Sequence, residues 1–181
     1  MLCGIASIMT GMNMLGNKID VRMAYKVLLV GSPGSGKTWV MKGIIKQLKC
    51  LKRQKIGLFS WHTNDDVMVL GKYDGSMYEG SDRLSMGIMK DIDLFLGYAS
   101  DKNVICEGDR FMNNTYISKV RPIIIKILDD GAGGRLKRGS TQTTRQLKSM
   151  NTRVSNVSAT YEVKDSNEAL ELINKIIDNE A

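Results

Sequence analysis

The sequence has one histidine, His62, and only three scattered cysteines in 181 residues. A single histidine excludes a histidine-rich metal site, and the lack of any C-x-x-C or Cys/His spacing predicts reduced thiols in a cytosolic protein. Long apolar runs are also missing, and the N-terminal segment has no basic region of the kind that opens a signal peptide. We therefore expect a cytoplasmic protein with no membrane association.

Acidic residues are in short supply, because 26 Lys and Arg face only 19 Asp and Glu, a formal net charge of +7. This excess favours a polyanionic partner such as nucleic acid, although an enzyme that binds nucleotides also collects cations around phosphates. Nothing in the composition calls for an obligatory protein partner. The length suits one α/β domain and is too short for two of ordinary size. We expect a single domain over residues 23–181 and an appendage of unknown role over residues 1–22.

The most specific motif is GSPGSGKT, which fits the phosphate-binding pattern G-x-x-x-x-G-K-[ST]. Its glycines let successive backbone N–H groups surround an anion, and the helix that follows adds its positive dipole end. We expect Lys37 to reach the β- and γ-phosphates of ATP and the Thr38 hydroxyl to bind Mg²⁺. The predicted nucleotide-binding residues are Gly31, Ser32, Pro33, Gly34, Ser35, Gly36, Lys37 and Thr38.

Apolar strands alternate with helical segments along the chain. Strands are expected at residues 25–30, 55–59, 103–108, 122–128 and 159–163. Helices are expected from the glycine-rich motif to about Lys52, from Asp82 through Ala99, across residues 141–150 and at residues 165–177. Strands separated by helices imply a parallel sheet with right-handed crossovers. The sequence therefore predicts an α/β fold, namely the three-layer P-loop NTPase fold of the nucleotide-kinase type with a five-stranded parallel sheet.

Three charged residues, Glu107, Asp109 and Arg110, lie at the end of the expected strand at residues 103–108, where open α/β proteins bind ligands. Glu107 and Asp109 are candidates to orient Mg²⁺ through water or to take a proton from an attacking hydroxyl group. We predict Asp109 as a metal ligand together with Thr38. Arg110 is a candidate to clamp phosphate oxygens. The alternative is that all three are solvated loop charges.

A second stretch, LGKYDGSMYEGSDRLSM at residues 70–86, has three glycines that predict a shaped loop. Within it, Tyr73 offers a stacking face for a base, and Asp82 and Arg83 are further candidates for substrate binding. Phosphorylation of a hydroxyl group needs a nearby carboxylate, for which Asp74 is the first candidate and Glu107 the second. The sequence does not rank these two securely. An ordinary surface loop of mixed charge is the alternative.

Basic residues crowd into the stretch before the last expected strand. They are Arg135, Lys137, Arg138, Arg145, Lys148 and Arg153. In a kinase for free nucleotides this position is a lid that closes over the transferring phosphoryl group. In a DNA kinase, residues such as Arg145 and Lys148 would also hold the backbone of the acceptor. A solvated basic face is the third interpretation. The GAGG sequence at residues 131–134 is expected to act as a flexible hinge.

Together, GSPGSGKT, LGKYDGSMYEGSDRLSM, VICEGDRF and the basic RGSTQTTRQLKSMNTRVSNV resemble a family of small P-loop kinases encoded by bacteriophages. Some of these kinases phosphorylate 5-hydroxymethyluracil within phage DNA. The resemblance covers residues 25 to 163 and implies ATP with Mg²⁺ as donor and a hydroxymethylated base in DNA as acceptor. We therefore expect this activity in the host cytoplasm. The alternatives are a deoxynucleoside monophosphate kinase and a P-loop ATPase stimulated by nucleic acid.

Overall fold

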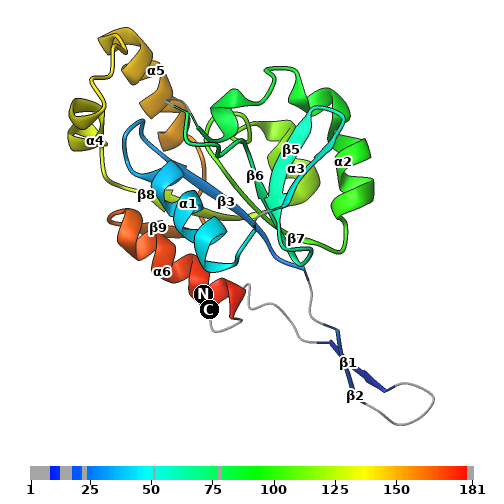
Figure 1. Ribbon diagram of the computed structural model, residues 1–181. Helices are drawn as coiled ribbons and strands as arrows, with labels where there is room; N and C mark the ends of the chain where they lie inside the picture. The colour runs from blue at the N-terminus through cyan, green and yellow to red at the C-terminus, as the bar shows by residue number, and fades with distance from the viewer. Residues whose placement is uncertain (1–8, 13–17, 22–23, 51, 77–78, 179–181) are drawn as a thin grey trace.

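The computed structural model describes residues 9–12, 18–21, 24–50, 52–76 and 79–178. Most of them form an α/β fold built on a mixed sheet of seven strands, with helices on both faces (Figure 1). The order of the strands across the sheet is β4-β5-β6-β7-β3-β8-β9. The prediction of an α/β fold is therefore confirmed at this level.

Five neighbouring strands of the sheet are parallel. They are β3 (Lys26–Gly31), β6 (Val67–Leu70), β7 (Asn103–Glu107), β8 (Ile123–Ile127) and β9 (Tyr161–Val163). The first four are rich in buried Val, Ile and Leu, as expected for strands that are covered on both faces. Because β3 lies between β7 and β8, the segments that follow these strands leave the sheet at one edge.

The predicted strand at residues 55–59 is wrong, because these residues span the turn between β4 (Lys52–Ile56) and β5 (Phe59–Thr63). Gly57 adopts a left-handed φ of 52° and reverses the chain there. β4 pairs antiparallel with β5, and β5 pairs antiparallel with β6. The predicted five-stranded, wholly parallel sheet is therefore corrected to a mixed sheet of seven strands.

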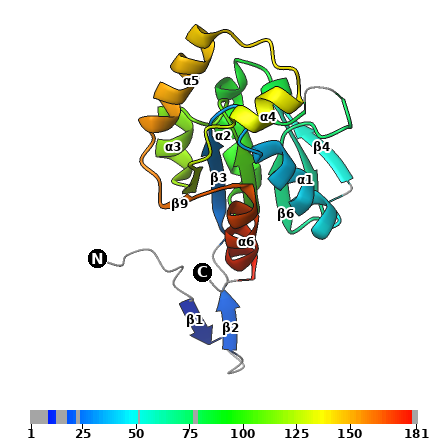
Figure 2. The same cartoon turned by 90° about the vertical axis from the view of Figure 1, so that its left-hand side faces the viewer.

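Helices α1 (Lys37–Gln47) and α6 (Ser166–Ile177) cover one face of the sheet, and α2 (Ile92–Ala99) and α3 (Asn114–Val120) cover the other (Figures 1 and 2). Each pair packs its apolar side chains on the sheet, which gives two buried clusters. α6 confirms the predicted C-terminal helix, and the Asp165 carboxylate caps it by accepting hydrogen bonds from the N–H groups of Asn167 and Glu168. α1 ends before Lys52, and α3 was not expected.

The helix predicted from Asp82 through Ala99 is broken at its start. Two 3₁₀ turns, η1 (Ser81–Arg83) and η2 (Ile88–Asp91), precede α2. The Ser85 hydroxyl accepts a hydrogen bond from the N–H of Gly87, a local turn that competes with helical hydrogen bonding. The predicted apolar stripe is nevertheless buried and consists of Leu84, Ile88, Ile92, Phe95 and Ala99.

Two further helices, α4 (Ala132–Lys137) and α5 (Thr144–Ser155), follow β8. Figure 2 places both at the upper end of the molecule, near the start of α1. The prediction of a flexible hinge at residues 131–134 is wrong, since these residues begin α4. α5 confirms the predicted helix at residues 141–150 with shifted bounds, and Thr143 and Gln146 form a capping box at its start.

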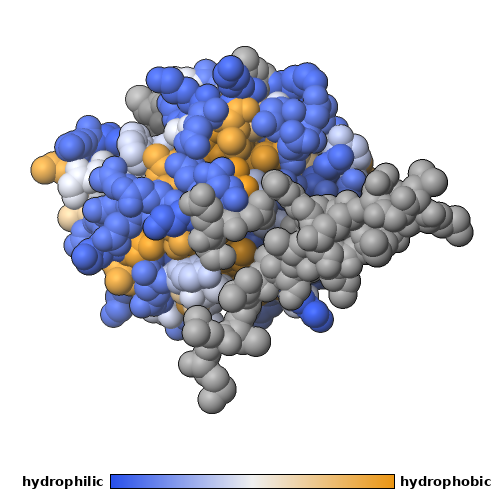
Figure 3. All heavy atoms as spheres, turned by 90° about the horizontal axis from the view of Figure 1, so that it is seen from below, coloured by the Kyte–Doolittle hydropathy of each residue, from blue (hydrophilic) through white to orange (hydrophobic). Residues whose placement is uncertain are grey.

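The two N-terminal strands, β1 (Met9–Met12) and β2 (Lys18–Val21), pair with each other in a separate two-stranded sheet. The remaining positions of the predicted appendage, 1–8, 13–17 and 22, lie outside the described residues, and its role stays a prediction. Seen from below, the surface shows small apolar areas among hydrophilic residues (Figure 3). Among the helices that the structure describes, none is long and apolar enough to cross a membrane.

Candidate active site

The glycine-rich loop joins β3 to α1 at the carboxyl edge of the sheet. Gly34 and Gly36 have φ values of 90° and 91°, a backbone conformation that residues with a Cβ rarely adopt. The Lys37 ammonium lies inside the turn and donates hydrogen bonds of 2.9 Å to the carbonyl oxygens of Gly31 and Ser32. The predicted loop residues are thus brought together around the start of α1.

The Thr38 hydroxyl connects this loop to the end of β7. It donates a 3.0 Å hydrogen bond to Oε1 of Glu107, whose side chain is buried. The same Oε1 accepts a longer hydrogen bond of 3.4 Å from the Tyr73 hydroxyl. A Cβ on Gly80 would overlap with this oxygen, so only glycine allows the backbone of the neighbouring loop to approach Glu107 so closely.

Burial and charge act in opposite directions on Glu107 and Lys37. Burial raises the pKa of Glu107, and the Lys37 ammonium and the Thr38 hydroxyl oppose that rise. Burial likewise lowers the pKa of Lys37, while the carboxylates of Glu107 and Asp82 oppose that change. Asp82 therefore lies within electrostatic reach of both groups.

Arg110 and Asp109 are both engaged by the protein. The Arg110 guanidinium donates to the backbone carbonyl oxygens of Leu84 at 3.2 Å and Asp82 at 3.4 Å, so it supports the segment that carries Asp82. Asp109 accepts a 2.6 Å hydrogen bond from the guanidinium of Arg153 on α5. The second Asp109 oxygen, Oδ1, is buried without a hydrogen-bond partner among the described residues.

The loop at residues 72–80 is closed by backbone hydrogen bonds in both directions between Lys72 and Gly80. Within it, the Asp74 carboxylate pairs with the Arg83 guanidinium. Hydrogen bonds from Ser76 and Arg83 lower the pKa of Asp74. In the part of the chain that the structure describes, no hydrogen bond or ion pair joins Asp74 to Lys37, Thr38 or Glu107. Among the described contacts, the second candidate, Glu107, is therefore the one that bonds to the glycine-rich loop.

Tyr73 does not offer the stacking face that the sequence predicts. Its side chain is buried in the core, where its ring packs edge-on against the His62 ring with 5.8 Å between the ring centroids. A base cannot stack on a ring in this position, and only the hydroxyl group reaches the site through Glu107. The three glycines predicted a shaped loop, but they did not show that the bend at Gly71 turns the tyrosine inward.

The start of α4 packs directly on the glycine-rich loop, a contact that the sequence did not predict. A Cβ on Gly131 would overlap with the carbonyl oxygen of Pro33, and a Cβ on Gly34 would overlap with that of Gly131. The Arg135 guanidinium adds a 2.7 Å hydrogen bond to the Pro33 carbonyl oxygen. Two glycines of the GAGG sequence, Gly131 and Gly134, are the only signal of this contact, and both pack closely against the loop.

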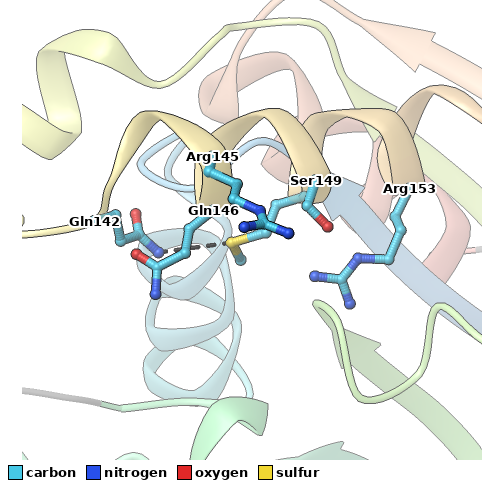
Figure 4. A pocket seen from close by; sticks show the side chains of 6 residues that line it. Gln142, Arg145, Gln146, Ser149 and Arg153 are labelled. Atoms are coloured by element: carbon cyan, nitrogen blue, oxygen red, sulfur yellow. Dashed lines mark hydrogen bonds between the residues drawn. The ribbon is translucent and has the colours of Figure 1, made fainter.

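An open hollow of about 350 Å³ lies along α5. Its lining residues are Gln142, Arg145, Gln146, Ser149, Met150 and Arg153. Figure 4 shows that Arg145, Ser149 and Arg153 extend from the same side of α5, as their spacing of four residues requires. Arg145 therefore faces the hollow as a predicted substrate-binding residue, whereas Lys148 is not part of the lining.

The donor set suits Mg²⁺ better than a transition metal. Mg²⁺ prefers oxygen ligands and is usually held by one or two protein groups, with phosphate oxygens and water completing its shell. The Thr38 hydroxyl beside the carboxylate of Glu107 provides such oxygens. Within the described ranges, no group of three or more His, Cys, Asp or Glu side chains is arranged to hold a metal ion on its own.

The fold and the site define an α/β protein with a glycine-rich loop and a buried carboxylate at the carboxyl edge of its sheet. Compared with known proteins, the chain matches no protein-family model and no curated protein.

Proposed function

We propose that the protein is a P-loop kinase that transfers the γ-phosphoryl group of ATP to the hydroxymethyl group of 5-hydroxymethyluracil in DNA. The observation that carries the proposal is the 3.0 Å hydrogen bond between the Thr38 hydroxyl and the Glu107 carboxylate. It brings the group expected at the metal and phosphates next to a carboxylate suited to handle the proton of an acceptor hydroxyl. Such an arrangement suits the transfer of a phosphoryl group from a bound nucleotide to the hydroxyl group of a bound acceptor.

The residues of the loop would bind the donor. Backbone N–H groups at the start of α1 and the Lys37 ammonium face the phosphates, and their positive charge stabilises negative charge on the transferring group. Thr38 would bind Mg²⁺ and Asp109 would orient the ion through water, as the sequence predicts. The bound ion would neutralise charge on the phosphate oxygens.

Glu107 is the better candidate for proton acceptor. A general base works best when its pKa lies near the working pH, and burial raises the pKa of Glu107 whereas hydrogen bonds lower that of Asp74. Glu107 is also the carboxylate that contacts the loop. We therefore assign Glu107 to the acceptor hydroxyl and Asp74, with its Arg83 partner, to the shape of the acceptor loop.

The acceptor is assigned to DNA from the net charge of +7 and from the resemblance of residues 70–86 and 138–157 to the phage kinases. A deoxynucleoside monophosphate is the second candidate. The open hollow along α5 favours it, because two arginines line it and arginine binds phosphate groups.

The test is a transfer assay with γ-labelled ATP and three acceptors: DNA that contains 5-hydroxymethyluracil, a panel of deoxynucleoside monophosphates, and water. Label in the DNA supports the proposal, labelled diphosphates support the second candidate, and free phosphate stimulated by plain DNA indicates an ATPase. The Lys37→Ala variant, checked for native circular dichroism, should lose transfer to every acceptor. Normal turnover in that variant would refute the assignment of the phosphate site.

A further inference from the structure

The chain has no acidic residue between Asp20 and Asp65. The second half of this interval carries an uninterrupted series of cations on α1 and β4, away from the basic residues on α4 and α5. Four of these cations are exposed and form no ion pair with any described residue, namely Lys46, Lys49, Arg53 and Lys55. We call these four residues the basic edge.

The four side chains belong to one side of the molecule. β4 is the terminal strand of the sheet, and its Gln54 faces α2, where it accepts a 3.2 Å hydrogen bond from the Tyr98 hydroxyl. Because side chains alternate along a strand, Arg53 and Lys55 face the opposite side, on which α1 lies. The end of α1 is held there by a 3.0 Å hydrogen bond from the Asn64 side chain to the carbonyl oxygen of Leu48.

Ordinary surface functions account for only part of this charge. One lysine near the end of a helix complements its dipole, and a charge on an edge strand discourages pairing with other sheets. Neither role requires four neighbouring cations without an acidic counterpart. The chain pairs other cations of this region, since Lys42 binds Glu79 at 2.8 Å and Lys52 binds Asp65. The basic edge is the part that is left without compensation.

We propose that the basic edge binds the phosphodiester backbone of DNA. This inference rests on the proposed function and extends it, because Lys42 connects α1 to Glu79 in the loop at residues 72–80, and the Gly80 end of that loop contacts Glu107. The same helix therefore carries the basic edge at its end and a link to the acceptor loop one turn earlier. Four separate cations favour a backbone over a single phosphate group, because a strand presents one charge after another.

The experiment measures the affinity of the full chain for fluorescein-labelled DNA, single-stranded and duplex, over a series of KCl concentrations. The test variant carries Lys46→Gln, Lys49→Gln, Arg53→Gln and Lys55→Gln. The matched control carries Lys90→Gln, Lys119→Gln, Arg121→Gln and Lys175→Gln, which removes the same net charge from exposed positions elsewhere. If all four residues contact phosphates, the slope of log K against log[salt] should fall by about 3 to 4 for a duplex and by about 3 for a single strand.

An unchanged slope in the test variant, or an equal loss in the control, would overturn the proposal, as would a wild-type chain that binds neither form of DNA. Binding of a fluorescent ATP analogue should be the same in all three proteins. Transfer to a free 5-hydroxymethyl-deoxyuridine nucleotide is measured alongside, because it does not depend on a long backbone. Loss of DNA binding with normal transfer to that nucleotide supports the basic edge. A wild type that transfers phosphate neither to this nucleotide nor to DNA that contains 5-hydroxymethyluracil counts against the kinase assignment alone.

Discussion

Glu107 is the residue on which the site depends, because it receives hydrogen bonds from two different segments. Thr38 reaches it from the glycine-rich loop, and Tyr73 reaches it from the segment that follows β6. Its position at the end of a buried strand could be predicted from the sequence. That Glu107 is a better candidate for proton acceptor than Asp74 could not be predicted. The choice depends on the burial of Glu107 and on the pairing of Asp74 with Arg83, nine residues away.

The first prediction compares these two carboxylates. Glu107→Gln keeps the size of the side chain and an oxygen that accepts the Thr38 hydroxyl, but it cannot take a proton. We expect it to lower the transfer rate by about 10²- to 10⁴-fold at unchanged ATP affinity. Asp74→Asn should have a much smaller effect on the rate. Steady-state kinetics with ATP titrations check both, and a larger loss in Asp74→Asn would reverse the assignment.

The second prediction concerns the titration of Asp74. Because Ser76 and Arg83 lower its pKa from the ordinary 3.8, the ionised form is favoured by folding. Its contribution to stability is complete above pH 3.8 and is lost as the pH falls toward the lower folded value. Arg83→Gln should raise the pKa of Asp74 toward 3.8. The Asp74 carboxyl chemical shift, measured by NMR during an acid titration, gives this pKa directly. An unchanged midpoint in the variant would show that Arg83 does not lower the pKa of Asp74.

At the scale of elements, the parallel strands and the glycine-rich loop could be predicted because their signals are local. Buried runs such as residues 26–31 and the spacing of the phosphate motif need no distant partner. The β4–β5 turn and the inward position of Tyr73 depend on tertiary packing, and a four-residue strand such as β6 is too short to show a period. The contact between α4 and the loop joins segments about a hundred residues apart, which no local pattern encodes.

The third prediction tests that contact with two glycines in one region. Gly131 has a φ of 76°, and a Cβ there would overlap with Pro33, so Gly131→Ala should lower the free energy of unfolding by at least about 1 kcal/mol and weaken ATP binding. Gly133 lies two residues further on with open space around it. Gly133→Ala should be neutral or stabilising by up to about 1 kcal/mol. Urea unfolding and ATP binding measure both variants, and equal effects would show that the packing is unimportant.

At the scale of the whole molecule, β1 and β2 form their own sheet, and the seven-stranded sheet is complete without them. Our fourth prediction is therefore that a chain starting at Ala24 folds normally. Its free energy of unfolding should change by less than about 1 kcal/mol, which corresponds to less than about 4 °C in Tm for a domain of this size. Thermal unfolding of the two chains checks this, and a larger loss would place the N-terminal strands within the domain.

Because α4 packs closely on the glycine-rich loop, the position of α4 depends on the conformation of that loop. The two backbones are in contact at glycines, so a wider loop would have to displace the start of α4. Leu136, on the outer side of α4, is 84% exposed and supports neither surface. A fluorescent dye attached at that position would move with α4, and its signal would report whether the proposed phosphate ligand is bound to the glycine-rich loop.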